Sequence, residues 1–95
     1  MDRQKAESTV LIDNAKTRVI EWHFAPGAHT GWHRHEHDYV IIPGGDGRLE
    51  IVTGEGESSI AEMRRDAPYF REAGVEHDVI NASDGPYSFI EIEFL

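Results

Sequence analysis

The sequence contains no cysteine. Disulfide bonds, thiolate zinc sites, iron–sulfur clusters and cysteine nucleophiles are therefore all excluded. Apolar stretches of transmembrane length are absent as well, and the polar N-terminal residues do not resemble a signal peptide. We therefore expect a cytoplasmic protein that does not act at a membrane.

Positive charge is scarce. Only 9 Lys and Arg residues stand against 18 Asp and Glu residues, which gives a net charge of −9 at pH 7. An acidic surface repels phosphate backbones and anionic lipid headgroups, so nucleic acid and membrane surfaces are not expected partners. The simplest consequence of the charge is solubility.

A helical period is also missing. Short apolar or alternating segments are separated by turn-forming residues at near-regular spacing, which is typical of an all-β sandwich or barrel. The 95 residues suffice for one small domain but not for two. We predict a flexible N-terminus over residues 1–8 and a single β-barrel domain over residues 9–95.

Residues 17–24 alternate between two faces, which predicts a strand with Ile20, Trp22 and Phe24 facing an apolar layer. The glycine-rich residues 44–47 and 54–56 are each followed by another strand-like segment. A glycine-rich loop that binds phosphate precedes a helix instead. We therefore predict two hairpin turns there.

Residues 87–95 alternate clearly between two faces. Phe89, Glu91 and Glu93 share one face. The opposite face is apolar throughout and consists of Ile90, Ile92 and Phe94. We expect the two glutamates to form a solvated face of this strand.

What the sequence does contain is a cluster of histidines. Of the six histidines, four lie in one short stretch: His29, His33, His35 and His37. Side chains two positions apart on a strand leave the same face, so His33 and His35 can converge on one point. Imidazole binds zinc, iron, nickel and copper, so this pair supplies half of a transition-metal site. His77, which precedes an apolar strand in the C-terminal half, is the candidate for a third ligand.

The spacing of these residues resembles the cupin family. Gly27, His33 and His35 follow the beginning of the first cupin motif, G-x5-H-x-H, and Gly74, His77 and Asn81 follow the end of the second, G-x2-H-x3-N. The resemblance implies a small antiparallel jelly-roll barrel, the double-stranded β-helix, which pairs as a homodimer. It further implies a divalent transition metal (Fe, Mn, Ni or Zn) held by His33, His35 and His77.

Departures from the cupin pattern concern the metal ligands most. Tyr39 stands where the family usually has a metal-binding glutamate, and Glu72 replaces the proline of the second motif. Without that glutamate the ligand set is neutral and weaker for iron or manganese. The strings TGWHRHEHDYVIIP and FREAGVEHDVINAS resemble a subgroup of small cupins named for β-alanine degradation, whose reaction is not established.

Tyr39 has three possible roles: a fourth metal ligand, a hydrogen-bond donor to metal-bound water or substrate, or a packed aromatic. A phenol with an ordinary pKa of about 10 is a poor ligand, so we predict a donor beside the metal. Tyr39 is then the one catalytic candidate.

The remaining candidate residues are expected at the edge of the site or outside it. His29 is expected at the rim of the cavity, whereas His37 and His23 are expected to face outward. Asn81 is expected to orient His77 or to form the cavity wall. Phe70 and Arg71 are possible residues of the cavity mouth.

Two functions remain open at this point. The first is a metalloenzyme acting on a small polar or carboxylated metabolite by O2-dependent, isomerase or lyase chemistry, linked to β-alanine or amino-acid catabolism. The second is a non-catalytic module that binds a small-molecule ligand. One fold supports both, so the site must decide between them.

Overall fold

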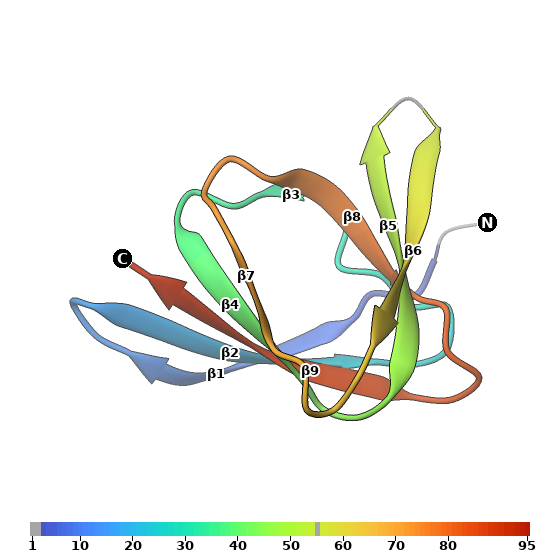
Figure 1. The fold of residues 1–95 in the computed structure, drawn as a ribbon, viewed down its shortest axis with the longest axis horizontal. Helices are drawn as coiled ribbons and strands as arrows, with labels where there is room; N and C mark the ends of the chain where they lie inside the picture. Colours follow the sequence, from blue (N-terminus) through green and yellow to red (C-terminus); the bar gives the residue numbers. More distant parts are fainter. Residues whose placement is uncertain (1–2, 55) are drawn as a thin grey trace.

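Nine strands build the protein, and the computed structural model describes residues 3–54 and 56–95 (Figure 1). The strands are β1 (Glu7–Asp13), β2 (Thr17–Phe24), β3 (His33–Arg34), β4 (Asp38–Pro43), β5 (Gly47–Gly54), β6 (Glu57–Met63), β7 (Tyr69–Arg71), β8 (Glu76–Asn81) and β9 (Tyr87–Phe94). None of the described segments forms a helix long and apolar enough to cross a membrane.

The strands form two antiparallel sheets. One has the order β1-β2-β9-β4-β7 and the other the order β3-β8-β5-β6. The two sheets face each other, and together their strands surround a common interior (Figure 1). This arrangement confirms the predicted all-β jelly-roll barrel, and β2 has the predicted bounds.

The predicted hairpin turn at residues 44–47 is wrong. β4 pairs with β7 and β9, whereas β5 pairs with β6 and β8, so these residues carry the chain from one sheet to the other. Their glycines serve close packing: a Cβ atom on Gly44 would lie 2.5 Å from the Ser88 carbonyl oxygen, and one on Gly47 would lie 2.8 Å from the Tyr87 ring. The second predicted hairpin does join β5 to β6, although Glu55 at its tip lies outside the described residues.

The N-terminal segment, predicted to be flexible, pairs with the barrel through its backbone. β1 already begins at Glu7, and residues before it pair with the histidine-rich segment. The Ala6 amide donates to the His29 carbonyl at 2.8 Å, and the His29 amide donates to the Gln4 carbonyl at 3.0 Å. Backbone pairing of this kind does not depend on apolar side chains, so a polar segment can form it. Met1 and Asp2, which belong to the predicted flexible segment, lie outside the described residues.

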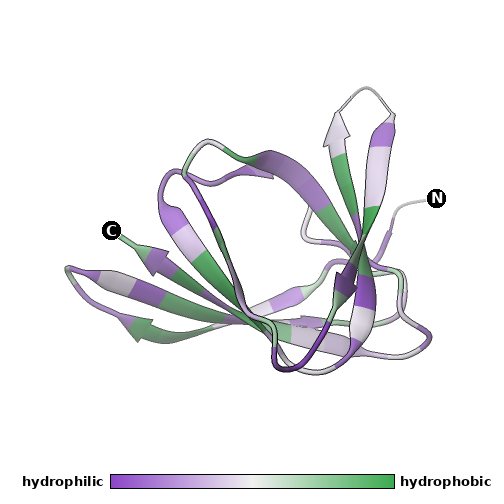
Figure 2. Cartoon of the chain, viewed as in Figure 1, coloured by the Kyte–Doolittle hydropathy of each residue, from purple (hydrophilic) through white to green (hydrophobic). Residues whose placement is uncertain are grey.

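Alternate residues of the five-stranded sheet face the interior. Phe24 of β2 is 1% exposed, and its ring centroid lies 5.5 Å from that of Phe89 on β9. Leu49 and Met63 of the other sheet complete the best-buried part of the core. Figure 2 shows the resulting alternation of hydrophobic and hydrophilic residues along the strands.

The prediction of a solvated glutamate face on β9 is wrong. Glu91 is 7% exposed and Glu93 is 8% exposed, because both share the inward face of Phe89. Pairing fixes this orientation: Glu91 lies opposite Ile41, and Glu93 opposite Tyr39, on the neighbouring strand β4. The apolar face of β9 points outward instead, so that Phe94 is 45% exposed.

Candidate metal centre

Three histidines from two parts of the chain converge inside the barrel. His33 on β3 lies opposite His77 on β8, and His35 follows directly after β3. The Nε2 atom of His35 is 3.0 Å from that of His33 and 3.2 Å from that of His77. Two imidazoles bound to one ion at 2.0–2.1 Å would have nitrogens about 2.9 to 3.4 Å apart, depending on the angle at the metal. The three side chains therefore fit one divalent transition metal.

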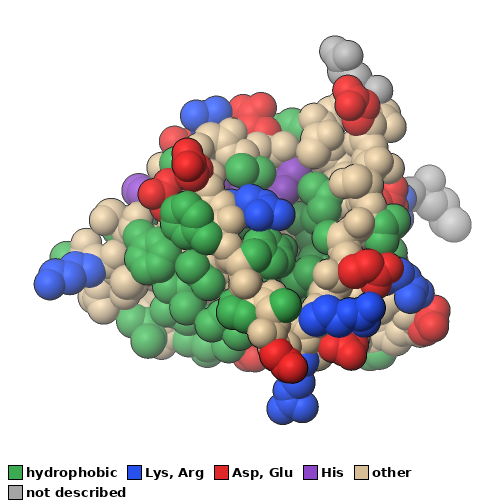
Figure 3. Space-filling view, in the orientation of Figure 1, with side chains coloured by type: hydrophobic (Ala, Val, Ile, Leu, Met, Phe, Trp, Pro, Cys, Tyr) green, Lys and Arg blue, Asp and Glu red, His purple; other side chains and the backbone are tan. Residues whose placement is uncertain are grey.

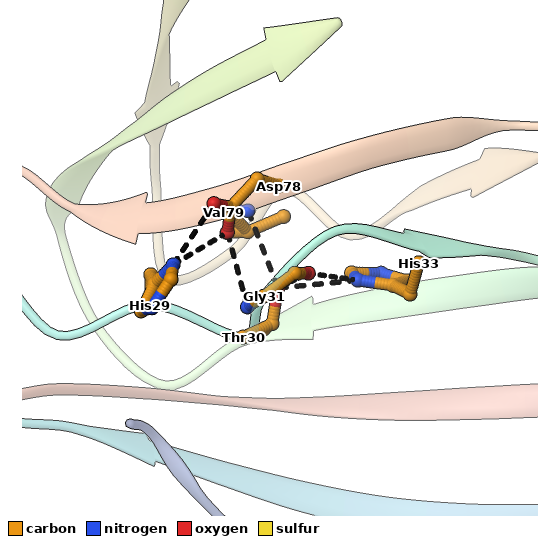
Figure 4. Close-up of polar contacts among 6 residues, drawn as sticks. All are labelled: His29, Thr30, Gly31, His33, Asp78 and Val79. Atoms are coloured by element: carbon orange, nitrogen blue, oxygen red, sulfur yellow. Dashed lines mark hydrogen bonds and ion pairs between the residues drawn. The ribbon is translucent and has the colours of Figure 1, made fainter. Parts of the chain in front are cut away.

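His33 is oriented by hydrogen bonds to its other ring nitrogen. Its Nδ1 lies 2.8 Å from the Gly31 carbonyl oxygen and 3.2 Å from the Thr30 hydroxyl oxygen (Figure 4). A carbonyl oxygen only accepts, so Nδ1 carries the proton and donates. Nε2 then keeps a free lone pair, which points toward the other histidines.

Asp78 ties this loop to β8. Its carboxylate accepts hydrogen bonds from His29 Nδ1 at 2.9 Å and from the Gly31 amide at 3.1 Å (Figure 4). The Val79 amide also donates to the Thr30 hydroxyl at 3.3 Å. His29 is not one of the three imidazoles that converge. Its hydrogen bond to Asp78 instead helps to hold the loop that carries His33.

His35 is held by its backbone and by one aromatic ring. Its amide donates to the Val75 carbonyl and its carbonyl accepts from the Gly74 amide, both at 2.8 Å. The Tyr39 ring stacks on the imidazole with centroids 3.9 Å apart and planes 18° apart. The main-chain bonds fix the position of His35, and the stack fixes the plane of its ring.

Burial keeps two of the histidines neutral. Burial, and then the neighbouring His33 and His77, lower the pKa of His35 to about 4. Burial, followed by His33, lowers the pKa of His77 to about 4, although Asp78 opposes the shift. A neutral imidazole has a lone pair for a metal, so neither histidine needs to lose a proton at neutral pH before it binds one.

Tyr39 packs as an aromatic beside the three histidines. It is 2% exposed, and burial, then Tyr69 and Glu91, raise the pKa of its phenol far above the ordinary value. The protonated form is therefore the stable one in the barrel. A hydroxyl that keeps its proton can donate a hydrogen bond, and this role for Tyr39 stays a prediction.

Glu91 and Glu93, which were predicted to face solvent, lie inside the barrel near His35. Ligand atoms of His35, Glu91 and Glu93 all lie within 4.8 Å of one another. Glu93 Oε1 is 3.6 Å from Arg18 Nη1, whereas Glu91 has neither an ion pair nor a hydrogen bond within the described part of the chain. Burial, and then Glu93, raise the pKa of Glu91 to about 7. The sequence does indicate their inward position, because Glu91 and Glu93 share a strand face with Phe89, and phenylalanine is normally buried.

The other candidates lie away from the convergence point. His23 is exposed, as expected, and its Nε2 lies 3.2 Å from Glu21 Oε1. His37 is partly buried although it was expected to be exposed. Asn81 does not contact His77: its amide group bonds the Phe24, Ala25 and Gly85 carbonyls and the Ser83 amide, and so joins two turns.

A small cavity lies where the histidines meet. Its volume is about 30 Å³, and its wall includes the three imidazoles, Tyr39 and Glu91. This is roughly the volume of one water molecule in the liquid, so the cavity suits an ion or a small group of a ligand. A groove of about 400 Å³ shares part of its wall with the cavity, through Tyr39, Ile51, Tyr69 and His77.

Comparison with known proteins agrees with this architecture. Residues 20–93 match the Cupin domain family. The chain is 53% identical over 91 residues to "Beta-alanine degradation protein BauB" of Pseudomonas aeruginosa strain PAO1, covering 96% of this chain and 95% of that protein.

Solved structures show the same fold. A cupin domain from Bordetella pertussis Tohama I superposes with a TM-score of 0.94 at 48% identity, covering 100% of this chain and 98% of the other. An RmlC-like cupin with a double-stranded β-helix fold from Methanocaldococcus jannaschii superposes with a TM-score of 0.77 at 11% identity, covering 98% and 83%. At that low identity the second likeness concerns the fold alone.

Proposed function

The chain belongs to the cupin family, and from this premise we propose that it is a metal-binding cupin that acts on a small polar or carboxylated metabolite. The observation that carries the proposal is the convergence of three Nε2 atoms at 3.0 and 3.2 Å beside a small cavity. Three protein ligands leave coordination positions open, as in catalytic rather than closed structural sites. When bound, a divalent iron, manganese, nickel or zinc ion would supply Lewis-acid chemistry, or O2 chemistry in the case of iron.

The residues that line the cavity would have different roles. His33, His35 and His77 would hold the metal, and the stack on Tyr39 would keep His35 in the ligating orientation. Glu91 is the one carboxylate in the cavity wall, so it is placed to accept or donate a proton. The Tyr39 hydroxyl would donate a hydrogen bond to a ligand. The barrel thus supplies acidic charge from β9, although position 39 lacks the usual glutamate.

A link to β-alanine catabolism is part of the proposal. It is supported by the name of the Pseudomonas aeruginosa protein and by the 53% identity over nearly the full length of both chains. The reaction itself is left open, because one fold carries many chemistries. Comparing turnover of three-carbon acids by the metal-loaded protein would test this link.

The alternative is a non-catalytic binding module, which the small cavity favours. Tyr39→Phe and Glu91→Gln separate the two functions, because both variants keep side-chain volume while removing a polar function. Turnover that falls while metal content is unchanged supports an enzyme. Ligand binding with no turnover, in wild type and variants alike, supports the binding module.

The first experiment is elemental analysis of the untagged protein purified without chelators, beside a His33→Ala/His77→Ala double variant. We expect close to one metal ion per chain in the wild type and loss of that metal in the variant. Circular dichroism checks that the variant remains folded. Equal and negligible metal in two folded proteins would overturn the metal-dependent function.

A homodimer in the cytoplasm completes the proposal. Support for the dimer comes from edge strand β1, where Val10, Leu11 and Ile12 are 57%, 49% and 50% exposed. Figure 3 shows hydrophobic side chains gathered over the five-stranded sheet on this side of the molecule. Such a surface is stabilised when a second copy covers it. Cell fractionation would test the location.

A further inference from the structure

The groove beside the metal centre carries a single charged residue. Its wall is formed by aliphatic and aromatic side chains, two hydroxyl groups (Thr53 and Ser59), His77 and Arg71. Arg71 is the one Arg or Lys among the described residues of this wall, which includes no Asp or Glu, and its charge is positive in a protein whose net charge is −9.

Arg71 is held in place without being neutralised. Its guanidinium carbon lies 4.6 Å from the centroid of the Tyr69 ring, and Nη1 donates to the Phe70 carbonyl at 3.2 Å. No carboxylate lies within ion-pair distance of it among residues 3–54 and 56–95. Contact with an aromatic face orders a guanidinium but leaves most of its donors free for an anion. Figure 3 shows cationic and histidine side chains next to each other in the middle of this face.

The position of Arg71 connects the groove to the metal centre. Arg71 on β7 lies opposite Tyr39 on β4, and Tyr39 stacks on His35 at 3.9 Å. Cβ atoms of such opposed residues are roughly 5 Å apart. Arg71 and His77 both line the groove, so a ligand held at Arg71 lies in the same groove as one of the three histidines.

We propose that this groove binds a small carboxylic acid, with Arg71 pairing its carboxylate while the opposite end enters the cavity of His33, His35 and His77. This inference rests on the proposed function, because the cavity is the reacting end of the same site. A guanidinium presents two parallel N–H groups to a carboxylate, which gives orientation as well as affinity. The body of the ligand would pack on the apolar groove wall.

Calorimetric titration of the purified protein with propionate and propanamide tests the inference, because the two molecules have the same size and shape but differ in charge. We expect propionate to bind and propanamide to bind far more weakly. Arg71→Gln should weaken propionate binding by about ten- to a hundred-fold, the usual range for a charged hydrogen bond. Arg71→Lys, which keeps the charge, should retain part of the affinity.

Arg64→Gln is the matched control, because Arg64 is exposed, has the same charge and does not line the groove. It should bind propionate as the wild type does. Equal affinity of wild type and Arg71→Gln, or equal affinity for propionate and propanamide, would overturn the inference.

The two proposals fail differently. If propionate binding disappears in the His33→Ala/His77→Ala variant but persists in Arg71→Gln, the metal holds the carboxylate: the carboxylate site is wrong and the metal-binding function stands. If the wild type contains no metal and still binds propionate through Arg71, the metal-dependent function is wrong and the carboxylate site stands.

Discussion

The two faces of β9 differ in the opposite sense to most strands of a small β-protein. Toward its C-terminal end, the inward face carries Glu91 and Glu93, while the outward face carries Ile90, Ile92 and Phe94. Antiparallel sheets usually bury the apolar face and expose the polar one. The inversion has two reasons. The glutamates face the polar site inside the barrel, and we propose that the outward apolar side chains contact a second chain.

The inward face of β9 lowers the stability of the protein at the position of Glu91. Burying an ionised carboxylate without a cationic partner costs free energy, and Glu91 responds with a raised pKa. The opposite end of the same strand shows no such conflict, because Tyr87 and Phe89 pack against the core beside Phe24. One strand therefore serves as a core element at its beginning and as a wall of the site at its end.

The largest expected effect on stability is that of Phe89→Ala on the inward face of β9, and Phe94→Ala on the outward face is its comparison. Phe89→Ala should lower the free energy of unfolding by about 3–5 kcal/mol, because it empties a packed site against Phe24. Phe94→Ala should cost much less in the monomer, because Phe94 is 45% exposed. Urea unfolding at low protein concentration measures both. Equal losses would show that the outer face is as well packed as the inner one.

Glu91→Gln sharpens the comparison through pH. The pKa of Glu91 is raised from 4.5 to about 7 in the folded protein, so the native state binds the proton more tightly than the unfolded state. Stability contributed by this group is therefore present below pH 4.5 and is lost as pH rises through 7. Glu91→Gln removes this penalty, and we expect a gain of about 1–3 kcal/mol at pH 8 that disappears near pH 4.

Thermal or urea unfolding of metal-free wild type and Glu91→Gln across this pH range provides the measurement. Glu62→Gln, at an exposed position on β6, is the control and should leave the pH profile unchanged. A gain that is constant from pH 4 to pH 8 would contradict a buried, titrating carboxylate at position 91.

The smallest effect on the stability of the monomer is expected for Ile12→Glu on edge strand β1. Ile12 is 50% exposed, and surface substitutions usually change stability by less than about 0.5 kcal/mol. Its effect on self-association should be large, because the new charge would be buried between two copies. Sedimentation velocity over a concentration series should show a dimer for the wild type and a monomer for the variant. A monomeric wild type would contradict the proposed homodimer.

Much of the candidate site was predictable from local sequence. The His-x-His spacing places His33 and His35 together on any strand-like segment, and the second glycine–histidine motif indicated His77. The glutamates were not predictable in this way, because alternation in residues 87–95 defines two faces without saying which one is inside. The apolar residues Ile90, Ile92 and Phe94 suggested the wrong choice.

The turn at residues 44–47 was misjudged for a related reason. Glycines in sequence indicate that the chain changes direction, and they do so equally well for a hairpin and for a crossing between sheets. Which of the two occurs depends on whether β5 finds its partner in β4 or in β6 and β8. That choice is made by contacts between residues far apart in the chain.

Local sequence was enough to predict the all-β character, the strand at residues 17–24 and the convergence of His33 with His35, because spacings of a few residues are converted directly into side-chain direction by local backbone geometry. His77 was a candidate from its glycine–histidine motif, and the pairing of β3 with β8 brings it to the other two. The tertiary structure alone decided that Glu91 and Glu93 line the barrel and that Arg71 lies beside the groove to the histidines. These positions depend on the pairing of β9 with β4 and of β4 with β7, and such pairing is selected by packing of the whole barrel.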